Sequence, residues 1–131
     1  ILLIVDACYS GLLTASRSAT LETPPLDQVS ARYRQLADEL AIEVITAGGK
    51  DEQVQDGGYK GHSVFTGFLI RGLEQGEADL IPDGVITSEE LGAYVWEKVK
   101  EQTHSRQNPR FCKLPDYEDE EGMVLFAVPR R

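Results

Sequence analysis

The chain opens with the residues ILLIVDACYSG, in which Cys8 follows an aliphatic run and an aspartate, Asp6. A thiol placed where a strand ends can be directed outward and, as its thiolate, can attack a carbonyl carbon. The backbone N–H groups after it can donate to the oxyanion formed in that attack, and Gly11 allows the tight turn. A free cysteine is more often a small buried apolar residue. Position and neighbours alone are equally compatible with both interpretations of Cys8.

The element that would position Cys8 is the run ILLIV at residues 1–5. Its continuous aliphatic composition is typical of a strand covered on both faces, as in parallel α/β sheets. Similar runs at 41–47 and 123–128 predict two further strands. Functional groups of open α/β sheets gather in the loops at the carboxyl ends of the strands, which is where Cys8 falls.

Three helices are predicted between these strands, beginning after the N-cap residues Asp27, Ser63 and Thr87. Thr87 and Glu90 together form a capping box. The helices carry apolar residues at helical spacing, namely Val29, Tyr33, Leu36 and Leu40; Val64, Phe65, Phe68, Leu69 and Leu73; and Leu91, Tyr94, Val95 and Val99. The order β, α, β, α, α, β predicts one α/β sandwich domain, or part of one, over residues 1–131, with a mostly parallel sheet.

The remaining segments are predicted to be loops, among them 75–84 and 108–122. We expect Trp96 and the tyrosines at helical spacing to belong to the core. Cys112 lies between apolar neighbours, so we expect it to be buried and inert.

Composition and charge restrict the classes of function. The 131 residues carry 13 Lys and Arg against 22 Asp and Glu, a net charge of -9, which disfavours nucleic-acid binding and favours a basic peptide as partner. The two cysteines form no disulfide framework, which fits a reducing, cytoplasmic compartment. No apolar run is long enough to span a membrane, so we expect no membrane association. We expect no cofactor and no metal ion.

The opening segment resembles the nucleophile segment of caspase-like cysteine peptidases, specifically the branch of metacaspases and bacterial caspase homologues. There an aliphatic strand runs into Asp-x-Cys-x-Ser-Gly. Further segments resemble the family in the same order, over about residues 1–110. They are ITAGGKDEQVQD, GHSVFTGFLIRGL, DGVITSEELGAYV and QNP. The resemblance implies a caspase-like α/β/α sandwich.

The resemblance also implies roles for individual residues. Cys8 is then the nucleophile, and Asp6 lines the pocket for the substrate residue that precedes the cut. An aspartate there matches an arginine or lysine by charge, whereas animal caspases carry a different residue and cut after Asp. Asp51, in the loop after the second strand, is a candidate second acid of this pocket. Asp6 as a strand-end turn cap is the structural alternative.

A peptidase of this type also needs a histidine as general acid and base. In the family it lies one strand before the cysteine, in a segment that this chain does not contain. His62 lies in a helix-start motif, and His104 follows a helix end, where it fits a charge partner for the helix C-terminus. The chain also begins without Met inside a predicted strand. We therefore expect a fragment or processed chain whose partner is the N-terminal part of the same peptidase domain, on the same or a separate chain.

Two other interpretations remain open. In the first, the chain is not part of an enzyme but a non-catalytic caspase-homology module for assembly or signalling. Residues 79–90 partly match a calcium-binding loop, although its third position is Ile81, which cannot bind the ion. If the enzyme cuts itself within the predicted loop 12–25, the basic specificity predicts cleavage after Arg17.

Overall fold

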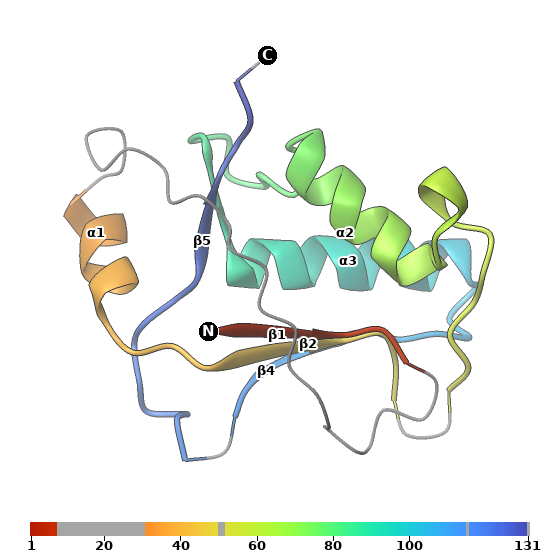
Figure 1. The fold of residues 1–131 in the computed structure, drawn as a ribbon, viewed down its shortest axis with the longest axis horizontal. Coiled ribbons are helices and arrows are strands. Elements are labelled where there is room, and N and C mark those ends of the chain that lie inside the picture. Colours follow the sequence, from red (N-terminus) through yellow and green to blue (C-terminus); the bar gives the residue numbers. More distant parts are fainter. Residues whose placement is uncertain (8–30, 50–51, 115, 131) are drawn as a thin grey trace.

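The computed structural model of the chain describes residues 1–7, 31–49, 52–114 and 116–130 (Figure 1). Cys8, Gly11, Arg17 and Asp51, all singled out by the sequence, lie outside the described residues. The described strands are β1 (Leu2–Val5), β2 (Glu43–Thr46), β3 (Val85–Thr87), β4 (Arg110–Lys113) and β5 (Leu125–Ala127). The described α-helices are α1 (Ala31–Asp38), α2 (Val64–Glu74) and α3 (Ser88–Gln102).

The larger sheet has the strand order β1-β2-β4. β1 and β2 are parallel, with Val5 opposite Thr46, and β2 and β4 are antiparallel, with Ile45 opposite Phe111. β3 and β5 form a separate antiparallel pair. The described part of the chain is therefore a mixed α/β structure whose main sheet contains the predicted parallel pair.

Helices α2 and α3 lie together on one side of the larger sheet (Figure 1). Apolar residues from both helices meet the sheet there, because each helix presents one apolar face. The core is formed by Ile45, Ala47, Val64, Phe65, Leu69, Ala78, Ile86, Leu91, Tyr94, Val95, Val99 and Phe126. This packing fixes α2 relative to the carboxyl ends of β1 and β2.

Two of the three predicted helix caps are confirmed, and the third, Asp27, lies outside the described residues. Ser63 is the N-cap of α2, and its hydroxyl accepts a hydrogen bond from the Thr66 N–H. Thr87 and Glu90 form the reciprocal capping box at the start of α3. Each cap satisfies N–H groups that have no partner within the helix, so these short sequence signals locate the helix starts.

Two of the described strands, β3 and β4, have no counterpart in the sequence prediction. β4 lies within 108–122, and β3 immediately follows 75–84 and pairs with β5. The prediction of one sheet required β5 to extend the main sheet, but in the described structure β5 pairs with β3 instead. These strands have only three or four residues, so their formation depends more on pairing with distant segments than on local composition.

Two predictions about burial are wrong. Trp96 is 45% exposed, because it lies off the face of α3 that carries Leu91, Val95 and Val99. Its ring is instead covered by the Lys100 ammonium, 4.4 Å from the ring centroid. Cys112 is exposed, because side chains alternate along β4 and its neighbour Phe111 takes the inward position.

Candidate active site

The carboxyl ends of β1 and β2 meet at one edge of the main sheet, because the two strands are parallel. The Ala47 N–H donates to the Val5 carbonyl oxygen at 2.8 Å and continues the pairing one residue beyond the end of β2. Asp6 follows β1 directly, and the segment with Gly48 and Gly49 follows β2. The structure thus brings Asp6 and the described start of the loop after β2 to the same edge.

The carboxylate of Asp6 is tied to the start of α2. Its Oδ2 accepts hydrogen bonds from Ser63 Oγ and Thr66 Oγ1, each at 2.5 Å. The side chain remains exposed. Within the part of the chain that the structure describes, no donor lies on Oδ1 and no cation pairs with the carboxylate. Asp6 is therefore a fixed negative charge that is open to solvent.

The loop after β2 is held by a second carboxylate, that of Glu52. Its Oε2 accepts from the Gly49 N–H at 3.0 Å and from the Asn108 N–H at 2.7 Å, and its Oε1 accepts from Asn108 Nδ2 at 3.0 Å. Partial burial would raise the pKa of Glu52, but these hydrogen bonds and the charge of Arg110 outweigh it and hold the pKa below the usual value. Glu52 thus fastens this loop to the segment after α3.

Gln107 completes this connection. It is fully buried; its Nε2 donates to the Ala47 carbonyl at 2.8 Å, and its Oε1 accepts from the Gln55 N–H at 2.9 Å. The amide therefore satisfies two backbone groups of the segment that follows β2, at the edge where Asp6 lies. Together Glu52 and Gln107 fix the backbone beside the candidate site.

The two histidines do not form a catalytic pair with any described residue. His62 is exposed and directly precedes the Ser63 N-cap. His104 is exposed beyond the end of α3 and adopts a positive φ of 50°. Neither imidazole is hydrogen-bonded to Asp6, whose carboxylate accepts, among the described residues, from hydroxyl groups.

The segment resembling a calcium loop is closed by its own hydrogen bonds. The Asp79 carboxylate accepts from the Asp83 and Gly84 N–H groups, and Gly84 has the positive φ of 86° that favours glycine in such a turn. Glu90, at the twelfth position, accepts from Thr87 and from the Ile81 N–H. Among residues 1–7, 31–49, 52–114 and 116–130, no three potential ligands are grouped to hold a metal ion.

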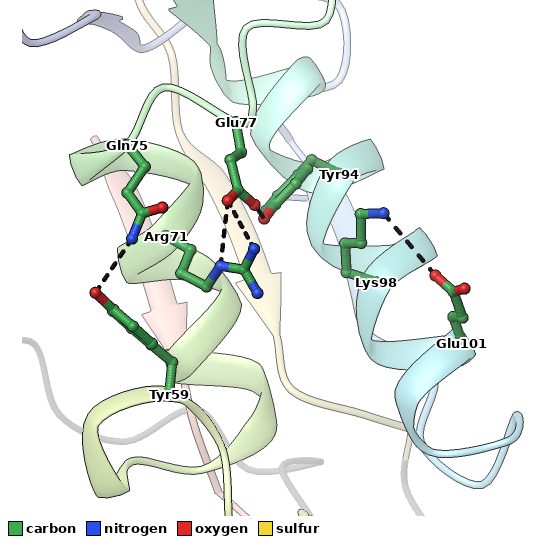
Figure 2. A network of polar contacts seen from close by, with 7 residues as sticks. All are labelled: Tyr59, Arg71, Gln75, Glu77, Tyr94, Lys98 and Glu101. Carbon is green, nitrogen blue, oxygen red and sulfur yellow. Dashed lines mark hydrogen bonds and ion pairs between the residues drawn. The ribbon is translucent and has the colours of Figure 1, made fainter.

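A surface pocket of about 580 Å³ lies between α2 and α3, and the polar contacts around it are drawn in Figure 2. Glu77 accepts from the Arg71 guanidinium at 2.7 Å through Oε1 and from the Tyr94 hydroxyl through Oε2. Burial, together with the bond to Glu77, raises the pKa of Tyr94 far above its usual value. On the α3 side Lys98 lies 3.9 Å from Glu101. Because these charges pair with one another and no thiol is among the described residues that line the pocket, we assign the network to stability.

The residues that support Asp6 were not predicted as parts of a site. Ser63 was recognised only as a helix cap, although a capping hydroxyl can also donate its proton. Thr66, one turn further, lies in the segment GHSVFTGFLIRGL that resembles the family, but nothing in the sequence linked its hydroxyl to Asp6. Glu52 and Asn108 lie 56 residues apart, so only the fold reveals their pairing.

Comparisons of the chain with models of protein families, with curated proteins and with solved structures gave no match. Within the described residues, no helix combines the length and the apolar character needed to cross a bilayer.

Proposed function

We propose that the chain is the nucleophile-bearing, C-terminal part of a caspase-like cysteine endopeptidase that cleaves after arginine or lysine. The observation that supports this most directly is the placement of Asp6. Its carboxylate is anchored, exposed and without a cationic partner among the described residues, two positions before Cys8. Such a group attracts the ammonium or guanidinium of a substrate side chain close to the thiol. An α/β/α sandwich for the whole domain belongs to the same proposal.

In the proposed reaction the Cys8 thiolate attacks the carbonyl carbon of the peptide bond that follows the basic residue. The C–N bond breaks, the leaving amine takes a proton, and the acyl group remains on sulfur as a thioester. Water then attacks the thioester and releases the carboxylic acid and the thiol. Backbone N–H groups of the turn that the sequence predicts at Gly11 would stabilise the oxyanion in both steps.

The histidine that accepts and returns the proton is assigned to the N-terminal part of the same domain, on the same or a separate chain. β1 supports this assignment, since it is an edge strand of the three-stranded sheet in the described structure. Ile1, which directly precedes β1, is 70% exposed, and Ile4, within β1, is 45% exposed. An aliphatic edge strand favours pairing with a further strand.

The test is covalent labelling of the full-length protein. A peptidyl acyloxymethyl ketone ending in arginine should modify Cys8, as located by mass spectrometry, and the Cys8→Ala protein should not react. Cys112 provides the matched control because it is the exposed cysteine of the described structure, so the Cys112→Ala protein should react like the unmodified one.

Two results would contradict the proposal. Labelling at Cys112 in place of Cys8 would show that exposure alone governs the reaction. Absence of labelling at Cys8, with the N-terminal part present, would favour the non-catalytic caspase-homology module. A ketone ending in aspartate separates the specificities, since efficient labelling by it would contradict the role given to Asp6.

A further inference from the structure

The two hydroxyl groups that hold Asp6 donate to the same carboxylate oxygen. Ser63 Oγ and Thr66 Oγ1 both lie 2.5 Å from Oδ2. A carboxylate oxygen has two lone-pair positions, so these bonds occupy the acceptor capacity of Oδ2. The other oxygen, Oδ1, has no donor among the described residues. The Asp6 carboxylate therefore presents one free oxygen.

We propose that Thr66 is a positioning residue that limits the advantage of arginine over lysine in the pocket at Asp6. This inference rests on the proposed peptidase function. A guanidinium group gains most from a carboxylate when its two parallel N–H groups meet both oxygens. An ammonium group is a compact charge that needs only one oxygen. Because Oδ2 is already occupied, both substrates bind through Oδ1. Arginine then cannot make the second hydrogen bond that would favour it over lysine.

Thr66, and not Ser63, is the residue through which this can be tested cleanly. The Ser63 hydroxyl also caps α2 by accepting from the Thr66 N–H at 3.0 Å, so its loss would weaken the helix. Among the described residues, the Thr66 side chain makes no capping bond, and its hydroxyl donates to Asp6. Valine has nearly the same shape, so Thr66→Val removes the donor and preserves the volume. One lone-pair position on Oδ2 then becomes available.

The experiment compares kcat/KM of the full-length protein on two peptides that differ only in having arginine or lysine before the cut. Thr66→Val should raise the ratio of arginine to lysine cleavage by about three- to tenfold, the worth of one additional hydrogen bond. Thr66→Ser keeps the hydroxyl and should retain the ratio of the unmodified protein. If Thr66→Val does not fold, Thr66→Ala serves the same purpose.

The outcomes separate this inference from the proposed function. An unmodified protein that cleaves after neither basic residue contradicts the peptidase proposal itself. Cleavage after both residues, with a ratio that Thr66→Val leaves unchanged or lowers, overturns the role of Thr66 and leaves the peptidase proposal standing. A ratio that rises equally in Thr66→Ser would also overturn it, because the hydroxyl would then be irrelevant.

Discussion

Asp6 and Glu77 are two carboxylates that each receive at least two side-chain hydrogen bonds, yet they occupy opposite electrostatic situations. Glu77 accepts from a guanidinium and from the hydroxyl of a tyrosine that is 2% exposed, so its charge is compensated within the fold. Asp6 accepts from two neutral hydroxyl groups and stays exposed. The donors of Asp6 orient its carboxylate without neutralising it.

This difference separates a carboxylate that stabilises the fold from one that can bind a ligand. Around Glu77, the positive charge comes from Arg71. The Arg71 guanidinium also lies over the ring of Phe68, one turn earlier in α2, at 5.6 Å from the ring centroid. At Asp6 no described side chain supplies such a charge. A substrate cation would therefore find its counter-charge at Asp6, whereas at Glu77 it would have to displace Arg71.

The strongest test of this contrast is Asp6→Asn in the full-length protein. Asparagine keeps the shape and an acceptor oxygen for the hydroxyls but removes the charge. We expect kcat/KM for peptides with arginine or lysine before the cut to fall by about 100-fold or more, because an ion pair is replaced by a neutral contact. The free energy of unfolding should change by less than about 1 kcal/mol, as for most exposed positions. Equal damage to folding and cleavage would identify Asp6 as a structural turn cap.

Glu77→Gln should give the reverse result. The change removes the charge that Arg71 and Tyr94 share, and we expect it to lower the free energy of unfolding by about 1–2 kcal/mol, measured by urea denaturation. The kcat/KM for peptides with arginine or lysine before the cut should not change. Glu74→Gln is the matched control, since the Glu74–Lys60 pair is exposed and should contribute nothing measurable. Cleavage that depends on Glu77 more than on Asp6 would reverse the two assignments.

The parts of the fold that could be predicted from the sequence are those specified by local chemistry. The caps at Ser63 and Thr87 involve residues three positions apart, and the helices that follow them begin where predicted. The aliphatic strands β1 and β2 also lie within their predicted runs. Trp96 was misplaced because residue type was used without its angular position on α3.

The candidate site divides in the same way. Asp6 was singled out through the resemblance of its Asp-x-Cys-x-Ser-Gly segment to the family, which is a local feature of the sequence. Its donor Thr66 lies 60 residues away in the chain, and Glu52 finds its partner Asn108 at a separation of 56 residues. Such pairings depend on how strands and helices assemble, and periodicity in one segment contains no information about them. Cys8 and Asp51 stay predictions, since both lie outside the described residues.

The smallest expected effect is the pH dependence of stability that Glu77 confers. Burial raises its pKa, but the hydrogen bonds from Tyr94 and Arg71 and the charge of Arg71 outweigh burial and lower the pKa below the ordinary 4.5. Well above pH 4.5 the carboxylate is ionised in the folded and the unfolded chain, so its full stabilisation is present. As the pH falls further, the unfolded chain binds the proton first, and the stabilisation is lost through the folded pKa.

The difference in unfolding free energy between the unmodified protein and Glu77→Gln should therefore be constant above about pH 6 and shrink toward about pH 3. Subtracting the variant removes the contribution of Glu52, whose pKa is also lowered and which acts in the same direction. Urea denaturation at several pH values in this range measures the difference. If it stays constant or grows as the pH falls, the Glu77 carboxylate is not held in its charged form by Arg71 and Tyr94. The contrast with the uncompensated carboxylate of Asp6 would then disappear.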